Sequence, residues 1–191
     1  MFFRSERLFL RPGWPEDWAE LLARIADEAV VMNLATAPWP YTPEDARAFA
    51  AREQAHRAPH FLVTLPGADG TRVIGCAGLG GSGNADELGY WISREHWGQG
   101  YATEAVRAVL DVARMLGHRR ITACHFVDNP ASGRVLTKAG FQRVGRPVTA
   151  FSQARGGNAL ALAYAIDLVA PDGTGEGNDG PDLRPVMRRA A

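Results

Sequence analysis

The chain has 191 residues, of which 46% are hydrophobic, and it carries 21 basic and 21 acidic side chains. This length predicts one domain with a continuous core. A formal net charge of zero produces no overall field that would favour nucleic acid or an anionic membrane, so we expect neither as a partner. The N-terminus has no signal-peptide pattern and no apolar run reaches the ~18 residues of a membrane span, which predicts a soluble cytoplasmic protein.

The first half of the chain mixes strand and helix signals. Residues 4–10 alternate charged and apolar side chains, which predicts a half-buried strand. Residues 17–25 have the apolar spacing of a helix. After a stretch rich in proline and aromatic residues, 35–43, Thr42 is the expected N-cap of a second helix that begins with Pro43.

A hairpin is expected next. Strands predicted over 61–65 and 72–80 flank Asp69-Gly70, a pair typical of hairpin turns. Cys76 and Cys124 lie in apolar runs without a further cysteine or a histidine at metal-ligand spacing. We therefore expect buried free thiols and no metal site.

The second half predicts strands over 87–93, 121–127, 141–151 and 160–168, with helices over 103–116 and 129–140. Together these elements indicate a single mixed α/β (α+β) domain over residues 1–169. Residues 170–191 are rich in Gly, Asp and Pro, which predicts a flexible C-terminal tail.

Two glycines near the middle of the chain point to a ligand site. Gly98 and Gly100 lie between the predicted strand over 87–93 and the predicted helix over 103–116. Glycine permits a tight turn and a close approach of the backbone to a ligand. The start of a helix has free N–H groups and a partial positive charge. A phosphate or pyrophosphate is therefore the expected ligand, although the same glycines could simply turn the chain.

Two other patterns are decoys. Residues 78–83 match G-x-G-x-x-G, but a strand rather than a helix is expected after them, so dinucleotide binding there is not predicted. His56 and His60 have helical metal-ligand spacing, yet Pro59 between them breaks the helix that would bring them together.

A second motif lies downstream, Asn129-x-x-Ser132 followed by Val135, Lys138 and Gly140-Phe141. Taken with the segment from Trp97 to Ala105, it resembles the GNAT superfamily of N-acetyltransferases, and more narrowly the RimJ/RimL-like branch that acetylates ribosomal-protein N-termini. The resemblance implies a single-domain acyl-CoA N-acyltransferase fold. Its mixed, mostly antiparallel, twisted sheet is splayed at the central strands and flanked by helices. A homodimer is a further expectation.

The same resemblance implies acetyl-CoA as co-substrate. Its pyrophosphate would lie on backbone N–H groups over 98–103, and its pantetheine arm along the strand that ends at Ile92. The family usually has Gln or Arg where this chain has Trp97, so the phosphates would depend on backbone donors, with Arg134 or Lys138 as further candidates. The residues expected to bind the coenzyme are Trp91, Ile92, Trp97, Gly98, Gln99, Gly100, Tyr101, Ala102, Thr103, Asn129, Ser132 and Lys138.

Acetyl transfer needs a base for the amine, a donor for the thioester oxygen and an acid for the thiolate. Glu87 is the expected base, directly or through water, although it could be an exposed edge charge; Asp86 should face the other way. The N–H near Ile92 is the family's donor. Ser132 is the expected acid unless it only caps its helix, and Tyr101 is a weaker choice. His125 could be a base or a structural residue.

We therefore predict an acetyl-CoA-dependent N-acetyltransferase that acts on a primary amine, with a protein or peptide N-terminal α-amine as the leading acceptor. Residues 39–41 and the hairpin end near Phe151 are expected to shape the acceptor groove. Three alternatives stay open: a small-molecule acceptor such as a polyamine, aminoglycoside or amino acid; a non-catalytic acyl-CoA-binding module; and an oxidoreductase that would bind NAD at residues 78–83.

Overall fold

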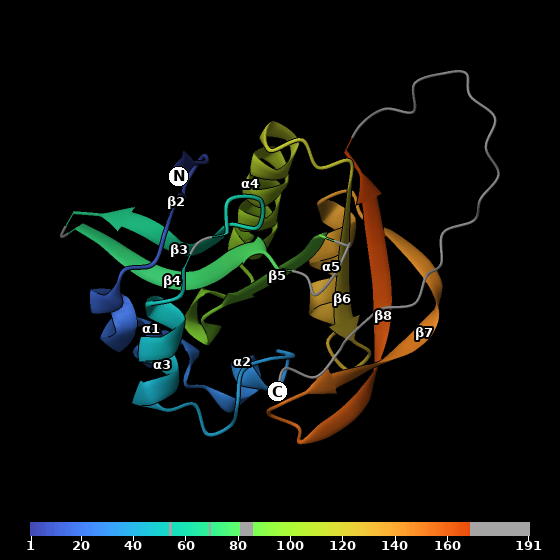
Figure 1. Ribbon diagram of the computed structural model, residues 1–191, viewed down its shortest axis with the longest axis horizontal. Coiled ribbons are helices and arrows are strands. Elements are labelled where there is room, and N and C mark those ends of the chain that lie inside the picture. The colour runs from blue at the N-terminus through green and yellow to red at the C-terminus, as the bar shows by residue number, and fades with distance from the viewer. Residues whose placement is uncertain (54, 69, 81–85, 169–191) are drawn as a thin grey trace.

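The computed structural model describes residues 1–53, 55–68, 70–80 and 86–168. Eight strands form one sheet in the order β1-β2-β3-β4-β5-β6-β8-β7 (Figure 1). The strands are β1 (Phe3–Arg4), β2 (Phe9–Arg11), β3 (His60–Gly67), β4 (Gly70–Leu79), β5 (Asp86–Ile92), β6 (Arg120–Phe126), β7 (Gln142–Ser152) and β8 (Gly157–Asp167). The α-helices are α1 (Trp18–Ile25), α2 (Glu28–Val31), α3 (Pro43–Ala50), α4 (Tyr101–Met115) and α5 (Pro130–Lys138).

The sheet is antiparallel except where β5 meets β6. These two strands are parallel, and their pairing is limited to Asp86 with Ile121 and Glu87 with Thr122. Beyond Glu87 the strands diverge, as Figure 1 shows. The mixed, mostly antiparallel sheet with splayed central strands is therefore confirmed.

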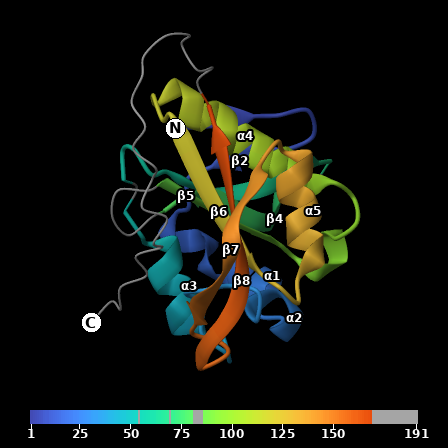
Figure 2. The same ribbon diagram turned by 90° about the vertical axis from the view of Figure 1, so that its right-hand side faces the viewer.

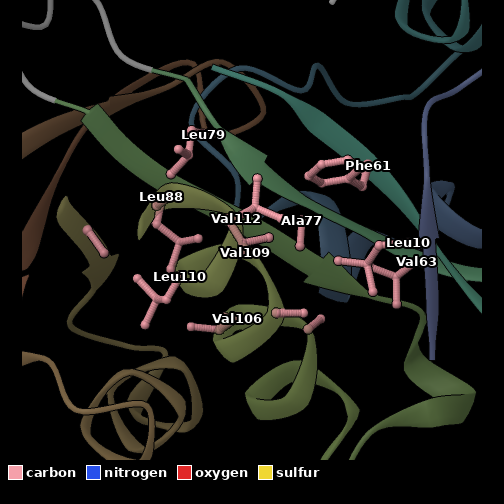
Figure 3. Close-up of a cluster of buried hydrophobic side chains, with 14 of the residues drawn as sticks. Leu10, Phe61, Val63, Ala77, Leu79, Leu88, Val106, Val109, Leu110 and Val112 are labelled. Carbon is pink, nitrogen blue, oxygen red and sulfur yellow. The ribbon is translucent and has the colours of Figure 1, made fainter. Parts of the chain in front are cut away.

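The helices cover both faces of the sheet. α4 packs on one face through an apolar stripe that includes Val106, Val109 and Leu110, all at most 1% exposed. In Figure 3 these side chains face strand residues such as Leu88 and Ala77, which belong to the same buried cluster. A second cluster, formed by α1, α2 and α3 with residues of β3, β4 and β5, covers the opposite face.

Local sequence signals explain how several helices begin. The Thr42 side chain accepts a hydrogen bond from the Asp45 backbone N–H, and the Asp45 carboxylate accepts one from the Thr42 N–H, so the expected cap of α3 is present. Asn129 caps α5 by accepting from the Ser132 N–H. The end of the β7–β8 hairpin lies beside α2 (Figure 2), where the Gln153 N–H donates to the Ala35 carbonyl.

Two expectations need correction at the N-terminus. The strand predicted over 4–10 is two short strands, β1 and β2, joined by a turn. The Ser5 N–H donates to the Leu8 carbonyl, and the Ser5 hydroxyl accepts from the Leu8 N–H. The sequence has four consecutive polar residues from Arg4 to Arg7, so the alternation expected of one strand is absent there, and a polar run of this kind is typical of a turn. Helix α2 was not predicted; its four residues, capped by the Asp27 side chain, are too few to display helical spacing.

The decoy glycines lead into a strand, as expected. β4 ends at Leu79 and β5, which begins at Asp86, pairs with it antiparallel. Residues 81–85 of this motif lie outside the described residues, as do Asp69 of the predicted turn and the predicted tail over 170–191. The domain boundary at 169 therefore stays a prediction.

Gly75 allows β4 and β5 to approach closely. A Cβ there would lie 2.2 Å from the Trp91 carbonyl oxygen and 2.8 Å from Cδ1 of Ile92. We expect Gly75→Ala to lower the free energy of unfolding by about 1–3 kcal/mol, because backbone must move to relieve the overlap. Urea unfolding measures this change. Gly89→Ala is the matched control, since its Cβ would meet nothing within 4 Å; an equal loss in both variants would contradict this interpretation.

Candidate active site

The turn before α4 presents a row of backbone donors. Gly98 and Gly100 have φ angles of 75° and 83°, in the left-handed region that favours glycine, and Gly100 is the N-cap of α4. No residue in the described part of the chain accepts a hydrogen bond from the N–H groups of residues 98–103. Free N–H groups at a helix start form a site suited to a phosphate or pyrophosphate.

The polar side chains of this turn hold it in place. The Trp97 indole N–H donates to the Ile92 carbonyl over 2.6 Å, and the Gln99 amide donates to the Glu95 carbonyl over 3.2 Å. Tyr101 packs its ring beneath the guanidinium of Arg7, 4.6 Å from the ring centre. The groups that the turn offers to a ligand are therefore its backbone N–H groups.

The register of β5 leaves alternate backbone groups facing the gap. The Ser93 N–H donates to Ile74, and the Glu87 carbonyl accepts from Gly80, so odd-numbered residues of β5 bond to β4. Even-numbered residues must then point away from β4, because hydrogen-bonding groups alternate along an antiparallel strand. Since the pairing with β6 ends at Glu87, the backbone groups of Tyr90 and the N–H of Ile92 face the gap between the strands, while the Ile92 carbonyl is taken by the Trp97 indole. This edge is where the pantetheine arm is expected to pair.

Side chains of β5 alternate between the two faces. Trp91 belongs to the buried cluster on the side of α1, α2 and α3, whereas Leu88 and Ile92 pack with α4. Trp91 pairs with Cys76 of β4, so neither its side chain nor its backbone faces the gap. Trp91, which was expected to bind the coenzyme, therefore presents no group to the gap.

Glu87 lies at the point where β5 and β6 separate. Its Oε1 accepts a hydrogen bond from the Cys124 thiol of β6 at 3.3 Å. Burial raises the pKa of Glu87, and the thiol hydrogen bond lowers it by less. Glu87 is thus not an exposed edge charge. Asp86 faces the other way, as expected, and bonds to His118 over 2.6 Å.

Ser132 reaches toward β5 from the first turn of α5. Its Oγ lies 2.7 Å from the Tyr90 Oη, and the cap of α5 is supplied by the Asn129 side chain instead. The alternative in which the Ser132 hydroxyl merely caps the helix is therefore wrong. Burial raises the pKa of Tyr90 to about 12, so its phenol stays protonated at neutral pH.

His125 and Lys138 belong to a different part of the surface. His125 is 6% exposed; its Nδ1 bonds to the Phe126 carbonyl over 2.8 Å and its Nε2 lies 3.4 Å from the Tyr164 hydroxyl. These contacts fit the structural role of His125, the alternative to a catalytic base. Lys138 and Arg134 line a hollow of about 490 Å³ on the flank of α5, together with His125 and Tyr164. No contact joins either cation to the turn over 97–103 in the described residues.

From the sequence we expect no metal site, no disulfide and no membrane span. Within them, no group of three His, Cys, Asp or Glu side chains could hold a metal ion, and Cys76 and Cys124 are free thiols, the second only half-buried. None of the helices that the structure describes combines the length and apolar character required to span a bilayer.

Sequence reasoning missed two partners of the site. Tyr90 bonds to Ser132, and Cys124 bonds to Glu87. Tyr90 shares the even-numbered spacing of Ile92, so the period of two along β5 could have drawn attention to it. No local signal identifies Cys124, because its contact depends on how β6 lies beside β5.

The family comparison matches residues 7–142 to an acetyltransferase (GNAT) domain. The chain therefore belongs to the GNAT family and is an acetyl-CoA-dependent N-acetyltransferase. The uncharacterized N-acetyltransferase YoaA of Bacillus subtilis is 42% identical over 74 residues, which span 38% of this chain and 42% of YoaA. The uncharacterized N-acetyltransferase YnaD of the same organism is 28% identical over 149 residues, 76% of this chain and 85% of YnaD.

Solved structures share the fold. An acetyltransferase of the GNAT family from Bacillus anthracis superposes with a TM-score of 0.73 and 24% identity, covering 88% of this chain and 99% of its own. RimL, a ribosomal L7/L12 α-N-protein acetyltransferase solved in complex with coenzyme A, has a TM-score of 0.70 and 19% identity, with 87% and 98% covered. At these identities the likeness establishes the fold alone.

The environment of Glu87 predicts an unusual titration. We expect its carboxyl to titrate above the ordinary value of about 4.3. The hydrogen bond from the Cys124 thiol stabilises the ionised carboxylate, so Cys124→Ala, which removes this bond, should raise the pKa of Glu87 further. Carbon-13 NMR of labelled carboxyl groups measures this, with Glu87→Gln to assign the signal. Cys124→Ser retains a donor and is the matched control. A Glu87 pKa at or below 4.3 would contradict the argument.

The raised pKa of Glu87 also makes the free energy of unfolding depend on pH. A folded pKa above the unfolded one favours the native state while Glu87 is protonated, and this contribution is lost as pH rises through the folded pKa. The free energy of unfolding of wild type should therefore fall relative to that of Glu87→Gln as pH rises above about 4.3.

Proposed function

We propose that this acetyltransferase transfers the acetyl group to the α-amine of a protein or peptide N-terminus, by direct attack of the amine on the thioester. The observation that carries the proposal is the position of Glu87 at the mouth of the gap between β5 and β6, with a raised pKa. In the reaction a C–N bond forms, the C–S bond breaks, the amine gives up a proton and the thiolate takes one.

Glu87 is the proposed base, directly or through a water molecule. Catalytic bases are most effective when their pKa approaches the operating pH, and burial moves Glu87 in that direction. An α-amine, with a pKa near 7.7–8.0, is about one-tenth neutral at pH 7, whereas a lysine amine, near 10.4, is almost wholly protonated. One moderate carboxylate is therefore better suited to an α-amine.

Ser132 and Tyr90 are proposed to serve the leaving thiolate. The Ser132 hydroxyl is the donor, and the Tyr90 phenol 2.7 Å away orients it and can replace the proton. The raised pKa of Tyr90, about 12, supports a role as donor, since the phenol does not ionise near neutral pH. These groups lie on the α4 face of β5, whereas Glu87 lies on the other face. Acid and base would thus approach the thioester from opposite sides.

Backbone groups would hold the coenzyme. We propose that the N–H groups of residues 98–103 bind its pyrophosphate, that the gap-facing backbone of Tyr90 pairs with pantetheine, and that the Ile92 N–H donates to the thioester oxygen, since the Ile92 carbonyl already accepts from the Trp97 indole. The free donors of the turn and the register of β5 support this assignment.

A protein acceptor has further support. RimL, whose fold this chain shares, is a ribosomal L7/L12 α-N-protein acetyltransferase. The hairpin end near Phe151, one of the two segments expected to shape the acceptor groove, is anchored to the residues that follow α2: the Ser152 hydroxyl donates to the Leu34 carbonyl, and the Arg155 guanidinium donates to the Met32 carbonyl. Small-molecule amines are the second candidate class of acceptor, and the screen described next includes them.

The test is an acceptor screen with acetyl-CoA against N-terminal peptides, peptides with a blocked N-terminus and an internal lysine, polyamines, aminoglycosides and amino acids. We expect peptides with a free α-amine to give the highest kcat/KM. Preference for a small amine would overturn the acceptor, and no turnover with any amine while acetyl-CoA still binds would favour a non-catalytic module.

Variants of the enzyme, assayed with its best acceptor, test the roles of Glu87 and Ser132. Replacing Glu87 and Ser132 together by Ala should lower kcat/KM by about 10²–10⁴, the usual contribution of acid–base groups, and leave the Kd for acetyl-CoA within about twofold. Rates and calorimetry measure the two effects. A double variant with wild-type turnover would remove both residues from the mechanism.

A further inference from the structure

The turn between β1 and β2 lies against the start of α4, although some 97 residues separate them in sequence. Arg7 of this turn makes most of the contact. Its backbone N–H and its Nε donate to the two carboxylate oxygens of Glu104, at 2.7 and 2.8 Å. The Ser5 hydroxyl donates to the same carboxylate at 2.7 Å.

Glu104 is ionised in this setting. Burial would raise its pKa, but the hydrogen bonds from Arg7 and Ser5 outweigh burial and lower it. A carboxylate in the first turn of a helix is favourable to the helix dipole. It also places a negative charge one turn from the N–H groups of residues 98–103, where it repels an anion unless a cation balances it.

Arg7 is that cation, and it also touches the turn itself. Its Nη1 donates to the Gln99 carbonyl at 3.1 Å, and its guanidinium stacks 4.6 Å above the Tyr101 ring. A Cβ built on Gly100 would lie 3.5 Å from Nη2 of Arg7. Nη2 donates to no acceptor in the residues that the structure describes, and it faces the same turn as the free backbone donors.

We infer that Arg7 is a positioning residue for coenzyme binding, which fixes the turn over 97–103 and neutralises Glu104 so that the turn accepts a pyrophosphate. This inference rests on the proposed pyrophosphate position. The ligand part that it serves is the pyrophosphate diester, not pantetheine or the acetyl group. The N-terminal hairpin is then part of the coenzyme site, although its backbone lies outside the strand–turn–helix unit.

This role of Arg7 predicts which ligands lose affinity when Arg7 is replaced. Loss of the guanidinium removes a charge-assisted contact to the turn and leaves Glu104 unbalanced, so pyrophosphate-containing ligands should bind less tightly. Pantetheine, which has no phosphate, should bind as before. A residue with only a structural role would weaken both ligands together.

The experiment measures Kd for acetyl-CoA by calorimetry and Kd for pantetheine by NMR titration, with wild type, Arg7→Ala and Arg7→Lys. Arg7→Ala should raise the Kd for acetyl-CoA by roughly ten- to hundredfold, the effect expected for hydrogen bonds to a charged group, with pantetheine unchanged. Arg7→Lys, which keeps the charge but cannot span Glu104 and Gln99 together, should lose less. Arg114→Ala is the control: this exposed arginine of α4 pairs with Asp111 and should have no effect.

The outcomes separate this inference from the proposed function. Unchanged affinity of Arg7→Ala for acetyl-CoA, or equal loss for acetyl-CoA and pantetheine, would overturn the role of Arg7. Failure of wild type to bind acetyl-CoA would overturn the pyrophosphate position itself. Should Arg7→Ala not fold by urea unfolding, Arg7→Lys carries the test, and its affinity for acetyl-CoA must still fall relative to pantetheine.

Discussion

The parallel pairing of β5 with β6 lasts for two residue pairs and then stops, and the remaining features of the site depend on where it stops. A β-strand whose neighbour has turned away leaves every second backbone N–H and carbonyl without a partner strand. On β5 these groups belong to Tyr90 and to the N–H of Ile92, because the bonds to β4 use the odd-numbered residues and the Ile92 carbonyl accepts from the Trp97 indole. The divergence therefore exposes an edge in the middle of the sheet, where an extended ligand can add as a strand.

The side-chain period of two gives this edge two chemically different faces. Glu87 lies at the last paired position and contacts Cys124, while Tyr90 lies on the face of α4 and reaches Ser132 on α5. A buried carboxyl, proposed to accept a proton, and a hydroxyl pair, proposed to donate one, are thus held on opposite sides of one strand. The turn that follows β5 adds the third part, free N–H groups before α4, held by Trp97, Gln99 and Arg7.

Much of this arrangement could be predicted from sequence because its causes are local. The glycines before α4, the Thr42 cap and the Asn129-Pro130 start of α5 act over a few residues, and the structure has each element near its expected bounds. Contacts between distant segments could not be predicted. The turn at Ser5, the bond between Tyr90 and Ser132, and the ion pair of Arg7 with Glu104 depend on how strands and helices pack. Apart from the polar run over residues 4–7, which is a turn signal, the local sequence pattern is the same with or without these contacts and contains no information about them.

The central claim is that the coenzyme pyrophosphate binds at the helix start after Gly98 and Gly100, and not at the glycine run over 78–83. Calorimetric titration with acetyl-CoA and with NAD, on wild type and on Gly98→Val and Gly100→Val, tests it most directly. Valine at these left-handed positions strains the turn and redirects its N–H groups. The account predicts that wild type binds acetyl-CoA and not NAD, and that both variants bind acetyl-CoA more weakly. Binding of NAD, or full affinity for acetyl-CoA in both variants, would contradict it.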